Sequence, residues 1–108
     1  MQKKFNIHIL PSAEKSLQEI HDYISNKLRN PDSADKLIDD FAKEFKTIAK
    51  TPNAFPKVDY DKFDRDYYKC RVRNFVGFFT VDEGKGLINI ERIYYGKRDI
   101  ENLLKENK

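Results

Sequence analysis

The stretch Tyr68–Phe79 has the sequence YKCRVRNFVGFF, and its first half alternates between cations and residues that a core could accept. Successive side chains of a strand point to opposite faces, so the alternation predicts one charged face and one buried face. The two sets are Lys69, Arg71 and Arg73 on one side, and Tyr68, Cys70 and Val72 on the other. We therefore expect a strand over residues 67–73 with a row of positive charge along it.

The residues after this strand predict two more strands and the turn between them. Residues 75–81, FVGFFTV, are apolar at nearly every position, which is typical of a central strand covered on both faces. Residues 82–86, DEGKG, are rich in turn formers, and their glycines can take positive φ. Residues 87–95 form the last predicted strand, which Gly96 ends.

Two amphipathic helices joined by a tight turn are predicted upstream. In each of them apolar residues recur with the period of one helix face. The first set is Ala13, Leu17, Ile20, Ile24 and Leu28, and the second is Leu37, Ile38, Phe41, Phe45 and Ile48. Ser12 is the expected N-cap of the first helix, and Asp32 or Ser33 is that of the second.

The remaining segments complete the predicted fold. A short strand over residues 5–10 precedes the helices, residues 52–66 predict a surface loop, and residues 99–104 suggest a short terminal helix. The order β-α-α-β-β-β plus a C-terminal helix predicts an α+β fold, with a helical hairpin packed on one face of a mainly antiparallel twisted sheet. At 108 residues the chain is expected to form a single domain, residues 1–108.

The composition excludes several classes of protein. The lone Cys70 excludes an internal disulfide and disfavours a zinc site, so no cofactor is expected. No apolar run approaches the roughly 18 residues of a membrane span, and the N-terminus lacks the long apolar core of a signal peptide. The sequence therefore predicts a cytoplasmic protein without a membrane partner.

The net charge of +3 is unevenly distributed. Residues 1–66 hold 12 basic and 12 acidic side chains, residues 67–98 hold 7 and 3, and residues 99–108 hold 2 and 3. The whole positive excess therefore lies in the segment that contains the alternating strand. A basic stripe of this kind is expected of a protein that binds a phosphate backbone, although a solvated strand edge carries the same residues.

The element order, the strand pair YKCRVRNFVGFF and the closing run ERIYYGKRD at Glu91–Asp99 together resemble the RelE/ParE superfamily of toxins from bacterial type II toxin-antitoxin systems. The resemblance covers nearly the whole chain and implies a small basic protein that a cognate antitoxin neutralises by wrapping around it. RelE-like members cut messenger RNA in the ribosomal decoding site. ParE-like members inhibit DNA gyrase and lack the nuclease residues, so the fold leaves the function open.

Metal-independent cleavage of RNA by 2′-OH attack needs a proton acceptor, a proton donor and fixed cations around the phosphorane. Arginine suits bidentate phosphate contact, and a tyrosine, with a pKa near about 10, can act as an acid. On the resemblance, the catalytic candidates are Arg71, Arg98, Tyr94 and Tyr95, and the RNA-binding candidates are Lys69, Arg73, Arg92 and Lys97.

The chain departs from the RelE-like nucleases at two places. Val76 or Gly77 stands where those enzymes carry a middle-strand arginine, and Leu104 stands near their C-terminal tyrosine. The candidates also have structural interpretations: an exposed strand edge for the cations, an ion pair at a helix start for Arg98, and ordinary strand aromatics for the tyrosines. Three functions remain open: a ribosome-dependent mRNA endonuclease (an mRNA interferase), a gyrase inhibitor, and an inactive relative that only binds its antitoxin.

Other polar residues are weaker candidates. His8 and His21 are distant in sequence from the cations and are interpreted as structural. Glu91 is expected to share a strand face with Asn89 and Tyr95, where an ion pair to a neighbouring strand is favoured over a role as a base.

An antitoxin helix is expected to lie across the sheet or the helical hairpin. Its anchoring sites would be apolar residues beyond what the core requires. The candidates in and after the proline-containing loop are Phe55, Phe63, Tyr67 and Tyr68.

Overall fold

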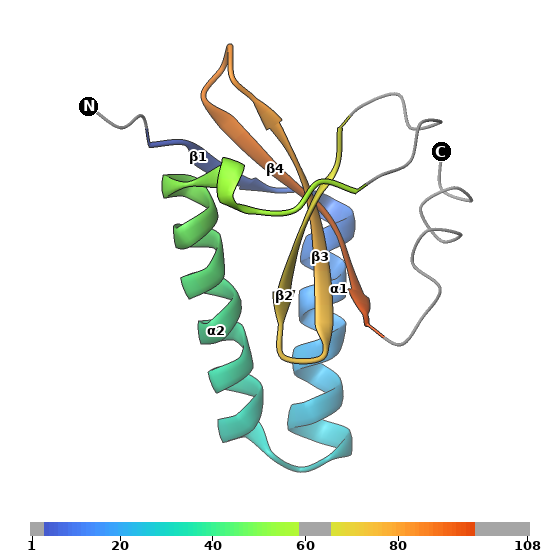
Figure 1. Cartoon of the computed structure of the whole chain (residues 1–108). Coiled ribbons are helices and arrows are strands. Elements are labelled where there is room, and N and C mark those ends of the chain that lie inside the picture. The colour runs from blue at the N-terminus through green and yellow to red at the C-terminus, as the bar shows by residue number, and fades with distance from the viewer. Residues whose placement is uncertain (1–3, 59–65, 97–108) are drawn as a thin grey trace.

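The computed structural model describes residues 4–58 and 66–96 of the chain (Figure 1). The predicted helix at residues 99–104, together with Phe63, Lys97, Arg98 and Leu104, lies outside the described residues. The elements are β1 (Asn6–Ile9), α1 (Pro11–Asp22), the π-helical turn η1 (Tyr23–Lys27), α2 (Pro31–Lys50), the 3₁₀ turn η2 (Pro52–Ala54), β2 (Tyr68–Val72), β3 (Phe75–Asp82) and β4 (Leu87–Tyr95).

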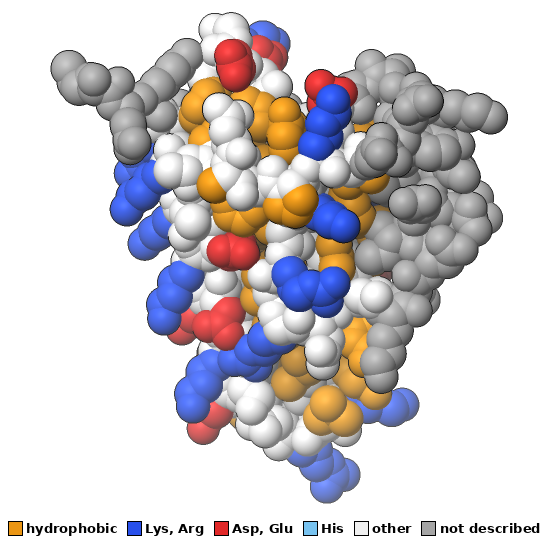
Figure 2. Space-filling view, in the orientation of Figure 1, with side chains coloured by type: hydrophobic (Ala, Val, Ile, Leu, Met, Phe, Trp, Pro, Cys, Tyr) orange, Lys and Arg blue, Asp and Glu red, His pale blue; other side chains and the backbone are white. Residues whose placement is uncertain are grey.

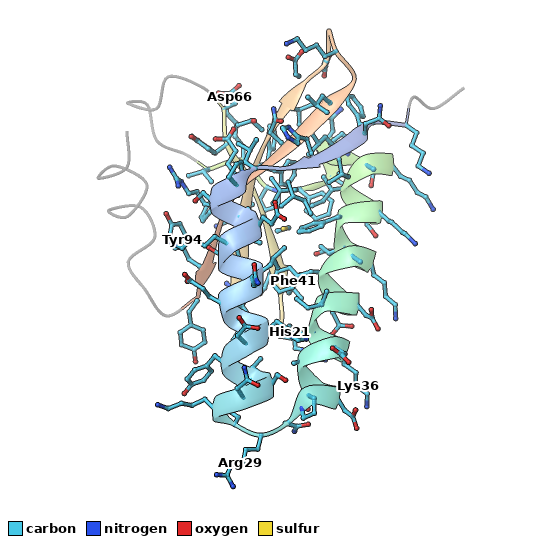
Figure 3. The ribbon with its side chains drawn as sticks, turned by 180° about the vertical axis from the view of Figure 1, so that it is seen from behind. His21, Arg29, Lys36, Phe41, Asp66 and Tyr94 are labelled. Atoms are coloured by element: carbon cyan, nitrogen blue, oxygen red, sulfur yellow. The ribbon has the colours of Figure 1, made fainter. Side chains whose placement is uncertain are left out.

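The four strands form one sheet in the order β1-β4-β3-β2. The hairpins β2–β3 and β3–β4 are antiparallel, while β1 pairs in parallel with β4. Helices α1 and α2 run side by side on one face of this sheet, as the view from behind shows (Figure 3). The α+β prediction of a helical hairpin on a mainly antiparallel sheet is confirmed.

Both helix starts differ from the predicted caps. The N-cap of α1 is Leu10, which makes no side-chain cap bond, and Ser12 already lies inside the helix. The N-cap of α2 is Asn30, whose side chain accepts a hydrogen bond from the backbone N–H of Ser33 at 3.2 Å. The predictions of Ser12 and of Asp32 or Ser33 were wrong for one reason: a proline takes the first position of each helix, and the cap is then the residue before it.

The core lies between the helices and the sheet. Its main cluster joins one face of α2 to the inward side chains of the three longer strands, as the helical and strand periods predicted. The largest fully buried side chains are Phe41, Phe79, Leu37, Ile48, Ile88 and Ile90. Burial of these side chains is the main term that stabilises the fold.

The start of the predicted loop is part of the packed structure. Pro52 is buried, and the ring of Phe55 meets Phe79 edge-on, with centroids 5.7 Å apart. Lys57 pairs with Tyr68 across the edge of β2, and the ring of Tyr68 stacks on Phe79 at 5.6 Å. The prediction that Phe55 and Tyr68 lie outside the core was thus wrong. Both pack against the core at the edge of the sheet and cover it there.

His21 ties the helical hairpin together (Figure 3). Its Nε2 lies 2.9 Å from Oδ1 of Asp35 on α2, and its Nδ1 lies 3.8 Å from Asp22. The hydrogen bond to Asp35 is the main cause that raises the pKa of His21 above its ordinary value of 6.5. The structural interpretation of this histidine agrees with these contacts.

The raised pKa of His21 predicts a pH-dependent contribution to stability. A folded-state pKa above the unfolded value means that the contribution is complete below about pH 6.5 and is lost as pH rises through the folded pKa. The His21→Gln variant should therefore lose more stability, relative to the unmodified chain, at about pH 5.5 than at about pH 8.5 in urea unfolding. In an Asp35→Asn background the stability loss caused by His21→Gln should depend less on pH. An equal pH dependence in both backgrounds would contradict the conclusion that Asp35 raises the pKa of His21.

Candidate functional site

The face of the sheet turned away from the helices carries most of the described candidates, and we refer to it as the outer face. Its side chains follow from the strand register, because residues directly opposite each other in an antiparallel pair lie on the same face. One row across the sheet is Lys69, Phe78 and Arg92, and the next row is Arg71, Val76 and Tyr94. The predicted alternation along β2 is confirmed, with Lys69 and Arg71 exposed and Cys70 and Val72 buried.

Cations surround an apolar strip on this face. Val76 and Phe78 are buried, and Val58, Tyr67 and Tyr94 pack against them. The space-filling view shows Lys and Arg side chains interspersed with hydrophobic ones over the sheet (Figure 2). The outer face can therefore offer both charge and apolar contact to a macromolecule.

Arg73 does not belong to the outer face. It lies in the turn between β2 and β3 with φ of 53°, and its guanidinium pairs with Asp40 of α2, with Nη2 at 2.8 Å and Nε at 2.9 Å from Oδ2. The predicted row of three cations was wrong because the strand ends at Val72 and the turn directs Arg73 to the helix side. Two strand cations, Lys69 and Arg71, remain.

Arg71 reaches across β3 to the end of β4. A Cβ placed on Gly96 would lie 3.4 Å from Nη1 of Arg71 and 3.0 Å from the carbonyl oxygen of Asn74. The backbone N–H of Gly96 also donates to that Asn74 carbonyl at 2.7 Å. The absent side chain of Gly96 therefore leaves room for the guanidinium beside the point where the chain continues to Lys97 and Arg98.

Tyr94 and Tyr95 lie on opposite faces of the sheet. The ring of Tyr94 packs against Phe78 on the outer face at 6.2 Å, whereas that of Tyr95 packs at 5.7 Å against Phe75, which contacts the helix-side residue Phe41. The two rings therefore pack on different faces of β4. Of the predicted pair, only Tyr94 shares a face with Arg71.

A bulge in β4 decides which residues share the outer face. Phe78 is opposite Arg92 and Phe79 is opposite Ile90, so Glu91 is the extra residue. The bulge shifts the alternation, and the prediction that Glu91 and Tyr95 share a face was wrong. Periodicity along one strand cannot show a bulge, since it depends on the pairing with β3.

Glu91 is buried within this bulge. The hydroxyl of Thr80 donates to its Oε2 at 2.6 Å, and that of Tyr67 donates to Oε1 at 3.4 Å. Next to it, Nη1 of Arg92 donates to the hydroxyl of Ser12 at 2.6 Å, which links β4 to the start of α1. These contacts hold Glu91 and Arg92 as fixed parts of the face. The sequence pattern did not identify Thr80 or Ser12 as their partners.

Val76 and Gly77, the two candidates for the position of the nucleases' middle-strand arginine, face opposite sides of the sheet. Val76 lies on the outer face beside Arg71 and Tyr94. Gly77 lies on the helix side, where an added Cβ would be 3.0 Å from Sγ of Cys70. An arginine pointing to the outer face could therefore only replace Val76.

The remaining polar candidates are not part of this arrangement. His8 on β1 is exposed and its Nδ1 lies 3.1 Å from Oδ1 of Asn89, and Cys70 is buried in the core, where burial raises its pKa to about 12. Within residues 4–58 and 66–96 no cluster of metal-ligating side chains is present. The helices of the same ranges include none with the length and apolarity to cross a membrane.

Solved structures with the same fold come from toxin-antitoxin systems. A chain of the chromosomal ParDE system from P. aeruginosa is 21% identical with a TM-score of 0.68, covering 86% of this chain and 97% of that chain. A chain of the RelE-RelB complex from Pyrococcus horikoshii OT3 is 15% identical with a TM-score of 0.61, covering 88% and 98%. A chain of the RelBE2 complex from Mycobacterium tuberculosis is 12% identical with a TM-score of 0.59, covering 85% and 98%.

Sequence comparison adds the family. A comparison with curated proteins finds no match. Residues 7–100 match the family described as "ParE toxin of type II toxin-antitoxin system, parDE". The matched range runs from β1 to beyond the end of β4. Match and fold together confirm the RelE/ParE resemblance, and the chain belongs to the ParE toxin family of type II toxin-antitoxin systems.

Proposed function

We propose that this chain is a toxin that binds and inhibits DNA gyrase, and that its outer face makes the contact. The family match carries this proposal, because ParE-like members of the superfamily are gyrase inhibitors and the match covers residues 7–100. The proposed target is cytoplasmic. Inhibition by binding requires a face that offers both charge and apolar area, and it does not require a catalytic group.

The arrangement of the outer face supports inhibition by binding. Among the described residues, the predicted site is divided: Tyr95, a predicted catalytic residue, lies on the helix side, and Arg73, a predicted RNA-binding residue, pairs with Asp40. The place of the nucleases' middle-strand arginine is taken by the buried Val76. Lys69, Arg71, Arg92 and Tyr94 remain together around the apolar strip, and this arrangement supports the proposal that the outer face binds the target.

A ribosome-dependent endoribonuclease is the second candidate, and one observation favours it. Arg71 and Tyr94 share a row of the outer face, and the guanidinium of Arg71 lies beside Gly96, which Lys97 and Arg98 follow in sequence. Cations and a tyrosine hydroxyl are two of the three groups that 2′-OH attack requires. In this mechanism Tyr94 would protonate the leaving 5′-oxygen and Arg71 would bind the phosphorane.

The proposal includes a cognate antitoxin as the partner of this chain. The structural neighbours are chains of toxin-antitoxin systems, and this chain carries its positive excess in residues 67–98. An acidic, helix-rich partner would complement that charge. Expression of the chain alone should arrest growth, and the product of a neighbouring reading frame should relieve the arrest.

Two assays on the purified chain separate the candidates. We expect inhibition of gyrase supercoiling of relaxed plasmid, and no cleavage by primer extension on a message translated by purified ribosomes. Cleavage without inhibition of supercoiling would transfer the assignment to the nuclease; Arg98→Ala should then lower the rate by about 100-fold, and Tyr94→Phe should lower it too. Neither activity from a folded chain that is harmless when expressed would identify an inactive relative.

A further inference from the structure

The exposed side of α2 is acidic in its first half and basic in its second half. Residues 31–40 hold four acidic side chains and one basic one, whereas residues 41–50 hold one acidic side chain and three basic ones. The basic side chains of the second half are all exposed, and they are Lys43, Lys46 and Lys50. In the space-filling view, Lys and Arg side chains follow one another along the side of the molecule that α2 forms (Figure 2). The second half of α2 therefore presents positive charge to the solvent.

Lys4 adds a fourth exposed cation to this set. The backbone N–H of the next residue, Phe5, donates to the carbonyl of Ala49 at 3.0 Å, which holds this part of the chain beside the last turn of α2. The basic margin, as we name the set, consists of Lys4, Lys43, Lys46 and Lys50. None of the four forms an ion pair with another described residue, so within the described part of the chain their charges are not neutralised.

The spacing of the three lysines on α2 suits a linear array of negative charges. At about 3.6 residues per turn and about 1.5 Å per residue, Lys43 and Lys50 lie within about 20° of each other around the helix axis and about 10.5 Å apart along it. Lys46 lies between them. Duplex DNA carries about one negative charge per 1.7 Å of its axis, so a stretch as long as this row presents about six phosphate charges. Each lysine can therefore find a phosphate partner.

The helix dipole accounts for only part of this arrangement. A cation near the C-terminus of a helix interacts favourably with the negative end of the dipole, and the effect falls off within the last turn. Lys50 is the basic residue of the last turn of α2, whereas Lys43 and Lys46 lie before that turn. Stabilisation of the helix end therefore explains Lys50 and not the other two.

The basic margin lacks the apolar area that a protein partner or a membrane surface would need. Among the described residues, the exposed large hydrophobic side chains are Tyr23, Leu28 and Tyr95, and none of them lies on α2. The apolar face of α2 is buried in the core, as Phe41 and Ile48 show. Protein interfaces have an apolar centre, and a helix that lies on a membrane inserts its apolar face. Positive charge without apolar area is typical of binding to a phosphate backbone.

The surroundings of the basic margin favour a duplex over a single strand. Proteins that bind single strands expose aromatic side chains on which the bases stack. The aromatic residues of α2, Phe41 and Phe45, are buried, and the ring of Phe5 packs against the core. A duplex keeps its bases stacked inside and offers its phosphates outside, so its backbone fits a surface of exposed lysines.

We propose that the basic margin binds the phosphate backbone of double-stranded DNA while the outer face contacts gyrase. The inference rests on the proposed function, because gyrase acts on duplex DNA and so brings a duplex to the bound toxin. Contacts of lysine with phosphate carry no sequence information, so this binding does not depend on DNA sequence. A second contact on the same assembly raises the affinity of the toxin for gyrase that holds DNA above its affinity for gyrase alone.

The test measures binding of the full chain to a fluorescently labelled duplex of about 20 base pairs by anisotropy. Four phosphate contacts should weaken binding by about 150-fold between about 50 and about 200 mM salt, because each contact contributes about −0.9 to the slope of log affinity against log salt. The margin variant combines Lys43→Gln with Lys46→Gln and removes two contacts, so its loss over the same range should be about 12-fold. Glutamine has nearly the helix propensity of lysine, so α2 should be retained.

The matched control combines Lys27→Gln with Lys36→Gln. Both residues are exposed, and they lie outside the basic margin, on η1 and on the acidic half of α2. The control lowers the net charge by the same two units, and its affinity should fall with salt as steeply as that of the unmodified chain. An equal change of slope in the control and the margin variant would overturn the proposal, because net charge and not the position of the lysines would then determine binding.

Further outcomes separate this inference from the proposed function. Tighter binding of a single-stranded RNA of the same length, or of vesicles containing anionic lipid, than of the duplex would overturn the DNA contact. No binding of the duplex by a chain that inhibits supercoiling would reject the DNA contact and leave the proposed function in place. Binding of the duplex by a chain that leaves supercoiling unchanged would support the DNA contact and reject gyrase as the target.

Discussion

Arg71→Glu is expected to raise the concentration of the chain needed to inhibit gyrase supercoiling by about 100-fold. Arg71 is exposed on the outer face, shares a row with Tyr94, and its guanidinium has a defined place beside Gly96. Reversal of its charge removes an attractive contact and introduces repulsion at the centre of the proposed interface. The fold should be retained, since the side chain points away from the core.

Lys36→Glu is the matched control for this prediction. It makes the same change of two charge units at an exposed position of α2, on the far side of the molecule from the outer face (Figure 3). Its inhibition should stay within about twofold of the unmodified chain at physiological salt, because charges farther than a Debye length of roughly 8 Å are largely screened. An equal loss of inhibition in both variants would mean that the net charge of the chain, and not a contact of Arg71, determines inhibition. Unchanged inhibition by Arg71→Glu would contradict the proposal that the outer face contacts gyrase.

The Phe79→Ala variant is expected to lower the free energy of unfolding by about 3–5 kcal/mol. Phe79 is fully buried in the middle of β3, and its ring contacts both Tyr68, stacked at 5.6 Å, and Phe55, edge-on at 5.7 Å. Truncation leaves a cavity beneath the residues that cover the edge of β2, so two neighbours lose their packing together. Urea unfolding followed by circular dichroism measures the change.

Tyr23→Ala serves as the aromatic control for Phe79→Ala. Its side chain is 56% exposed, and its loss should change stability by no more than about 0.5 kcal/mol. If Phe79→Ala were destabilised by less than about 1 kcal/mol with an unchanged m-value, the cluster around Phe79 would not be the centre of the core.

Regular periods made much of the fold predictable. The helical spacing of apolar residues identified α1 and α2, and the alternation along β2 and the apolar run of β3 identified those strands to within about one residue. Prolines at the first helical positions explain the misplaced caps, as Asn30 shows. These features depend on neighbours within a few residues, so the sequence by itself determined them.

The composition of the site was decided by tertiary structure. The candidate cations and tyrosines could be identified from the sequence. The face of the sheet on which each lies depends on the bulge at Glu91 and on the turn at Arg73. Arg73 pairs with Asp40 on the helix side and is therefore not part of the outer face. A cavity of about 740 Å³ between α1, η1 and the ends of β3 and β4 likewise arises only from the packing of these elements. Pairing register, bulges and contacts between residues far apart in the chain depend on how whole elements pack, and a period read along one segment holds no information about the segment it will face.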